Sequence, residues 1–323
     1  MRQRTSNAIY AAKSFAVLSI ISAHCAYVSP DFSKADLFCS HLLNSFGSFG
    51  VGIFLFFAGF FMFLTKSAPK DFFLKKLKTL LLPWLFCGTL VYLYVYIRKG
   101  GYGIKSWCLW ILGYNTYLYY MSVLFLLYIM CFFFRKNEIV CYLFIAISLA
   151  SNILTTVGRL NEIQPYLNPF NFLIYFSTGL LVARHNMLEK IFTVSKKYLW
   201  LSASLLGFIL LLTSYFKIEI SYFKYYFLPI EFVAFFAFCG ISYHLSNLGF
   251  FINIGKASFA VYLLHMPIAG ITANLFGKID FFLLTLIRPF VVLIIVYSAI
   301  KLLPLIFKNN KALSFIYTLI GMR

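Results

Sequence analysis

Two residues in the first apolar stretch of the chain can carry charge or a proton, Lys13 and His24. On an α-helix their spacing places them within roughly 20° of each other on one face and about 16 Å apart along the axis. Ionisable groups inside a membrane usually face a bundle interior or a wet cavity. The pair therefore indicates a binding cation at one depth and a catalytic histidine at another. The alternative is that Lys13 extends to the membrane surface and His24 is a hydrogen-bonded packing residue.

A basic cluster follows the second apolar stretch. It contains Lys66, Lys70, Lys75, Lys76 and Lys78. Closely spaced lysines bind phosphate groups as point charges, which would suit a phosphorylated ligand. The same composition is typical of segments that bind anionic membrane lipids, so both interpretations stay open.

A third candidate is the stretch from Gly255 to Ile268, which contains Lys256, His265 and Pro267. Helix rise places His265 about 13 Å beyond Lys256. Pro267 leaves backbone groups of the helix without partners, and a neighbouring side chain must satisfy them. His265 is either that neighbour or a contact to substrate.

Glu231 is the carboxylate that falls inside a predicted span, at a depth similar to that of His24. A carboxylate at this depth can orient a histidine, as in a catalytic triad. The alternative for Glu231 is a pairing with Arg288 or with a backbone group.

The composition identifies the surroundings of these residues. The chain of 323 residues is 62% hydrophobic and 21% aromatic, and only 11% of its residues are charged. A soluble domain of this size cannot bury so much apolar surface, so we expect a polytopic membrane protein. Its formal charge of +19 then reflects membrane topology, and no nucleic-acid partner is expected.

Apolar runs long enough to cross a membrane occur about ten times, which predicts an all-α bundle forming one integral-membrane domain over residues 1–323. The predicted spans are 9–28, 44–64, 80–97, 118–134, 139–157, 170–184, 196–215, 226–245, 257–275 and 282–306. Those at 118–134 and 170–184 are short. Lysine and arginine concentrate on the side of the N-terminus, so both termini are expected in the cytoplasm. The seven cysteines show no spacing typical of a metal or redox site, and we expect neither metal nor cofactor.

At these segments the chain resembles the acyltransferase-3 family of integral-membrane O-acyltransferases. The family's first span carries an arginine, ten residues and a histidine, and here Lys13 and His24 occupy those positions. Its second span carries a glycine- and phenylalanine-rich stretch like Gly50–Phe60. Its ninth carries a motif matched by Gly255, Lys256, Ser258, Tyr262, Leu263, His265 and Pro267. The resemblance covers nearly the whole chain, and we expect the standalone form of the family, without its extracytoplasmic esterase-like domain.

Three positions depart from the family pattern. Lys13 replaces the arginine, which removes the bidentate fork but keeps the charge. Ala58 replaces a serine, so no hydroxyl is available there. The family's Arg-x-x-Arg is matched by Lys75 and Lys78 in one register. If Pro83 sets the register instead, the pair is Lys76 and Thr79.

The resemblance implies an O-acetyltransferase of the cell membrane. It would use cytoplasmic acetyl-CoA to modify a sugar of a surface polysaccharide or of its lipid-linked precursor. Lys13, Lys75, Lys76 and Lys78 would hold the donor phosphates. His24 would be a general base or an acyl-carrying nucleophile, and Ser258, Tyr262 and His265 would contact substrate or support the fold. The alternative function is a transporter or flippase of an anionic lipid-linked sugar. The oligomeric state stays open.

Overall fold

The computed structural model of the chain describes residues 3–100, 103–160, 164–307 and 310–322, and these residues form helices joined by loops, without a strand. The helices of the first half are α1 (Gln3–Cys25), α2 (Lys34–Gly47), α3 (Phe49–Leu64), α4 (Pro69–Lys76), a π-helical turn η1 (Leu77–Leu81), α5 (Leu82–Lys99), α6 (Ile104–Leu112), α7 (Tyr119–Phe132) and α8 (Glu138–Thr156). Those of the second half are η2 (Pro169–Phe172), α9 (Leu173–Arg184), α10 (Leu188–Lys197), α11 (Leu199–Tyr215), η3 (Tyr225–Phe227), α12 (Leu228–His244), α13 (Gly249–Phe276), α14 (Phe282–Ile306) and α15 (Asn310–Ile320).

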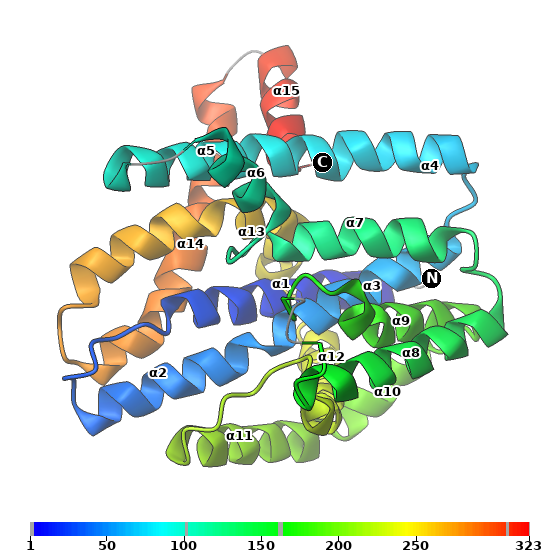
Figure 1. Cartoon of the computed structure of the whole chain (residues 1–323), viewed down its shortest axis with the longest axis horizontal. Coiled ribbons are helices and arrows are strands. Elements are labelled where there is room, and N and C mark those ends of the chain that lie inside the picture. Colours follow the sequence, from blue (N-terminus) through cyan, green and yellow to red (C-terminus); the bar gives the residue numbers. More distant parts are fainter. Residues whose placement is uncertain (1–2, 101–102, 161–163, 308–309, 323) are drawn as a thin grey trace.

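Helix α1 is the central element of the bundle. It packs against α2, α3, α12, α13 and α14, and Figure 1 shows it crossing the middle of the molecule. Alanines at 8, 11, 12 and 16 are fully buried along it. Small side chains let neighbouring helices approach closely in a membrane, where van der Waals packing rather than hydrophobic burial drives association. The sequence of α1 therefore suits a helix surrounded by others.

Close backbone contacts fix the neighbours of α1. A Cβ atom on Gly255 of α13 would lie 1.8 Å from the carbonyl oxygen of Tyr10, so only glycine fits there. The contact brings the segment that carries Lys256 and Tyr262 against the face of α1 that carries Lys13. Gly59 of α3 similarly lies against the backbone of Phe176 in α9. Gly59, which lies in the Gly50–Phe60 stretch, thus serves helix packing.

The predicted spans correspond to helices throughout. Among the described residues, seven helical segments are long and apolar enough to cross a membrane, and the pair α10–α11 would make an eighth if it counts as one span. Helices α7 and α9, which match the two ranges expected to be short, have 14 and 12 residues. Large apolar side chains such as Ile97 and Trp200 are more than 80% exposed, as lipid-facing residues are. The chain is a multi-pass helical membrane protein.

Several boundaries differ from the sequence-based ones. The second span is longer than predicted, because α2 and α3 together run from Lys34 to Leu64. The segment between the predicted spans 80–97 and 118–134 contains α6, and α15 follows the last predicted span. Between α10 and α11 the chain bends by 76°. Helix α10 buries Leu188 and Phe192 on one face and carries several lysines, as a helix lying along a membrane surface does.

Candidate active site

Two cavities border α1 at different positions along its length. The first, the lysine cavity, has a volume of about 670 Å³ and is bordered by Lys13 near the middle of the helix. The second, the amide cavity, has a volume of about 730 Å³ and is bordered by His24 near the C-terminal end. The two residues that the sequence places on one helix face therefore border different cavities.

The lysine cavity is cationic. Lys13, Lys76 and Lys256 border it, and no Asp or Glu is among the described residues of its lining. The aromatic ring of Tyr10 lies 5.9 Å from Nζ of Lys13 and 5.7 Å from Nζ of Lys256, both measured to the ring centroid. Rings at these distances stabilise an ammonium group. Three cations from three different helical segments thus surround one cavity, which favours an anionic ligand.

The residues of the basic cluster around the π-helical turn η1 differ in whether they border this cavity. Lys76 and Thr79 border it, whereas Lys75 and Lys78 are exposed and do not. A π-helical turn accommodates one extra residue and rotates the faces of the helix before it relative to those after it. The structure therefore agrees with the register set by Pro83. Lys76 donates a hydrogen bond of 3.0 Å from Nζ to the Tyr128 hydroxyl, and Oγ1 of Thr79 is buried without a partner among the described residues.

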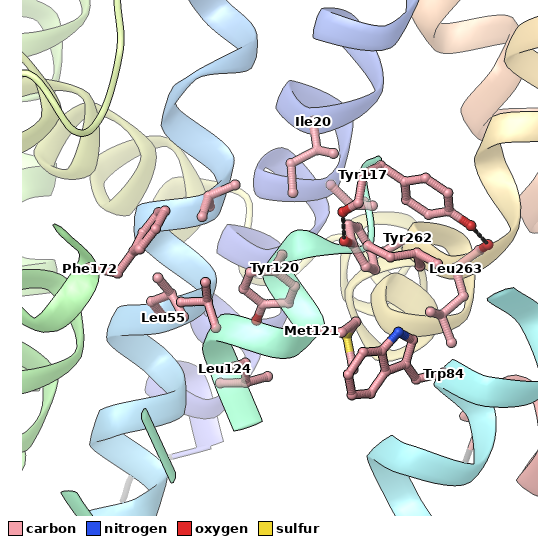
Figure 2. Close-up of a cluster of buried hydrophobic side chains, with 14 of the residues drawn as sticks. Ile20, Leu55, Trp84, Tyr117, Tyr120, Met121, Leu124, Phe172, Tyr262 and Leu263 are labelled. Atoms are coloured by element: carbon pink, nitrogen blue, oxygen red, sulfur yellow. Dashed lines mark hydrogen bonds between the residues drawn. The ribbon is translucent and has the colours of Figure 1, made fainter. Parts of the chain in front are cut away.

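A thin wall of side chains separates the two cavities. Tyr117 borders the amide cavity and Tyr262 borders the lysine cavity. The Tyr262 hydroxyl donates to the backbone carbonyl of Tyr117, and the Tyr117 hydroxyl donates to the backbone carbonyl of Leu263 over 2.9 Å. Figure 2 shows this reciprocal clamp between the chain just before α7 and helix α13. Tyr117 and Tyr262 thus join the linings of the two cavities.

Pro267 explains why Tyr117 binds at this point. The proline has no N–H, so the carbonyl four residues earlier, that of Leu263, lacks its helical partner. The sequence offered His265 as the side chain that could fill such a gap. In the structure, the Leu263 carbonyl accepts a hydrogen bond from the Tyr117 hydroxyl, which comes from a different segment of the chain.

His265 forms instead a contact pair with His24. Their ring centroids are 5.1 Å apart at an interplanar angle of 44°. His265 is fully buried, and its Nδ1 atom lies 2.6 Å from the carbonyl oxygen of Tyr262. Its Nε2 atom has no hydrogen-bond partner among the described residues. Two histidines, on α1 and α13, therefore meet at the wall between the cavities.

The amide cavity is polar and nearly balanced in charge. Its lining includes the carboxamides of Asn44, Asn115 and Gln164 and one side chain of each sign, Glu219 and Lys224. Aromatic rings complete it, with Trp110, Tyr119, Tyr166 and Tyr222 among its residues. Hydrogen-bonding amides beside aromatic faces suit a neutral, hydroxyl-rich ligand, because they donate and accept without requiring a charged group.

Glu231 does not reach His24. The carboxyl group borders a separate small cavity of about 110 Å³, together with Tyr175 and several phenylalanines of α3 and α12. Its Oε1 atom is buried without a partner among the described residues. Arg288, the other partner considered for it, donates instead to the backbone carbonyl of Tyr27 over 3.2 Å from both terminal nitrogens. A role for Glu231 in orienting His24 has no contact to support it.

Some residues of the site could not be found from the sequence. Tyr117 lies in a short segment after Gly113, whose positive φ of 86° allows a turn in which an added Cβ would lie 2.2 Å from the backbone of Tyr119. The glycine and the following Asn115 indicate a turn, but nothing indicates that this turn touches α13. Pro267 shows that a donor is needed there and leaves open which residue supplies it.

The motifs at these segments resemble those of the acyltransferase domain family, and the model of that family matches residues 7–307. The chain belongs to the acyltransferase-3 family. The match runs from α1 to the end of α14 and so includes both cavities and the histidine pair. Membership of this family supports acyl transfer as the activity. No curated protein and no solved structure was found to match the chain.

Proposed function

We propose that this acyltransferase moves an acetyl group from acetyl-CoA, held in the lysine cavity, to a sugar hydroxyl held in the amide cavity. The observation that carries the proposal is the position of His24 and His265 at a wall between one cationic and one neutral polar cavity. A donor rich in phosphate suits the first cavity and a glycan suits the second. The positive-inside rule assigns the lysine cavity to the cytoplasm, where acetyl-CoA is made available.

The donor binds through its charges. Lys13, Lys76 and Lys256 act as point charges on the phosphates of CoA, and the rings of Tyr10 and Tyr128 cover the apolar parts. Only the thin pantetheine arm with its acetyl group has to reach the wall formed by Tyr117 and Tyr262. Because the highly charged nucleotide part stays at the cytoplasmic end, no phosphate crosses the apolar interior of the bundle.

His24 performs the proton transfer. It takes the proton of the acceptor hydroxyl while the sugar oxygen bonds to the thioester carbonyl carbon. The carbon–sulfur bond then breaks, and the CoA thiolate leaves with the proton that His24 held. The second route places the acetyl group on His24 first and transfers it to the sugar afterwards, with the same atoms exchanged overall.

Sealed inside-out membrane vesicles test the arrangement. The cytoplasmic face is outside in such vesicles, so labelled acetyl-CoA is added to the medium and the acceptor glycan is enclosed in the lumen. We expect label on the luminal glycan, and none from vesicles that carry His24→Ala. Label that appears only on glycan supplied in the medium would show that both substrates bind at the cytoplasmic face. A flippase would move the acceptor without labelling it.

A further inference from the structure

The hydrogen atoms of His265 can be assigned from its surroundings. A backbone carbonyl only accepts hydrogen bonds, so Nδ1 of His265, 2.6 Å from the carbonyl oxygen of Tyr262, carries the proton. In a neutral imidazole the other nitrogen is then an acceptor with a free lone pair. That nitrogen, Nε2, is buried and has no partner among the described residues.

The rings around His265 leave one donor for this lone pair. Tyr117 and Tyr262 lie with ring centroids 5.3 and 6.0 Å from that of His265, but each has only one hydroxyl proton. Both protons are already engaged with backbone carbonyls, those of Leu263 and Tyr117. The remaining ring neighbour with a polar hydrogen is His24, at 5.1 Å.

We propose that His265 is a positioning residue for His24, whose ring N–H donates to Nε2 of His265. This inference rests on the proposed function of His24 as the base. The bond fixes the tautomer of His24, so that its second ring nitrogen is unprotonated and faces the amide cavity, where the acceptor hydroxyl binds. When His24 takes the proton of that hydroxyl, it keeps its bond to His265 and passes the new proton to the leaving thiolate. His265 thus fills the place that a carboxylate has in a triad.

The separation of the two rings fits a bond that tightens during the reaction. Hydrogen bonds among catalytic groups are often long before substrate binds. We expect rotation of the His24 side chain to align the rings, because His24 borders a cavity whereas His265 is held by its Nδ1 bond to the Tyr262 carbonyl. The buried lone pair of Nε2 is costly without a partner, which favours the aligned state.

Two substitutions separate this role from a structural one. His265→Gln retains an acceptor at about the position of Nε2, whereas His265→Asn retains only a donor at about the position of Nδ1, toward Tyr262. We expect the Gln variant to keep more activity than the Asn variant, whose kcat should fall roughly 100-fold with the KM for acetyl-CoA unchanged. In a His24→Ala background, His265→Asn should cause no further loss. An Asn variant more active than the Gln variant would assign His265 to holding the Tyr262 carbonyl, and would overturn the proposal.

A measurement on the unmodified protein covers the case in which the variants do not fold. An experimental structure with acceptor bound should place a ring nitrogen of His24 at about 2.7–3.2 Å from Nε2 of His265. A longer separation, or a different donor on Nε2, contradicts the proposal. Unmodified protein that is folded but inactive with acetyl-CoA would instead refute the proposed donor, and the structural measurement would still decide on the histidine pair.

Discussion

The lysine cavity and the amide cavity have similar volumes, about 670 and 730 Å³, but they are built in different ways. Helical segments supply nearly all of the lysine cavity, and the charged residues of its lining are all cationic within the part of the chain that the structure describes. The amide cavity takes much of its lining from three loops, around residues 113–117, 164–166 and 219–224, and contains charges of both signs. His24 borders the amide cavity and contacts His265, which lies beside Tyr117 and Tyr262 between the two cavities.

This difference indicates which substrate each cavity can select. Charges on regular helices recognise a ligand by its phosphates, which every CoA thioester shares, so the lysine cavity suits one constant donor. Loops tolerate changes in sequence and length far better than packed helices do. Under the proposed function, we therefore expect the amide cavity to determine which acceptor is bound. The predictions below test this division.

The largest effect is expected at His24, which borders the amide cavity beside the wall between the two cavities. His24→Ala should lower acetyl transfer on the order of 10²–10⁴-fold, the range of a lost general base, with the KM of each substrate little changed. Initial rates with labelled acetyl-CoA measure this. His41→Ala on α2 is the matched control, because His41 borders neither cavity. If the His24→Ala and His41→Ala variants were equally active, His24 would have no role in the proton transfer.

Substitutions of Lys13 test the cationic cavity. Lys13→Ala should lose most activity through weaker donor binding, because one of three charges around the phosphates disappears. Lys13→Arg should keep or raise activity, since arginine is the residue at this position in the family motif and contacts phosphate bidentately. The KM for acetyl-CoA is measured for both variants and compared with that of the unmodified protein. If alanine is tolerated as well as arginine, Lys13 only extends to the membrane surface.

The basic cluster allows a sharper comparison within a few residues. Lys76→Ala should raise the KM for acetyl-CoA roughly tenfold, the cost of one charge-assisted hydrogen bond. The double variant Lys75→Ala/Lys78→Ala removes more charge, but both of these side chains are exposed and outside the cavity. Its donor KM should stay near that of the unmodified protein. A larger rise in the donor KM for the double variant than for Lys76→Ala would assign phosphate binding to Lys75 and Lys78 instead.

The sequence could locate some of the residues that border or adjoin the two cavities, for a physical reason. Lys13, His24 and Lys256 lie on regular helices, where spacing alone fixes face and depth. The π-helical turn at Leu77–Leu81 breaks that regularity, and Pro83 was the one sign of it. Helix length and composition likewise predicted a multi-pass bundle, while the 76° bend between α10 and α11 depends on tertiary packing and was missed.

The other half of the site depends on contacts between distant segments. Tyr117 is 145 residues away from Tyr262, to which it is hydrogen-bonded. No periodicity connects a turn before α7 with a proline in α13, so the clamp between them could not be predicted. The same holds for Glu231, whose depth along α12 suggested His24 although its side chain faces a different cavity.

The smallest effect is expected in the loops of the amide cavity, and it is the most specific. Gln164 donates to the side-chain oxygen of Asn115 over 2.7 Å, and its own carbonyl oxygen, Oε1, is buried without a partner among the described residues. An acceptor hydroxyl can donate to that oxygen. Gln164→Ala should therefore raise the KM for the acceptor about fivefold, the value of one neutral hydrogen bond, and leave the KM for acetyl-CoA unchanged. Gln3→Ala, which removes an exposed glutamine bordering neither cavity, serves as the control. A Gln164 variant whose donor KM rises instead would show that the two substrates do not bind in separate cavities.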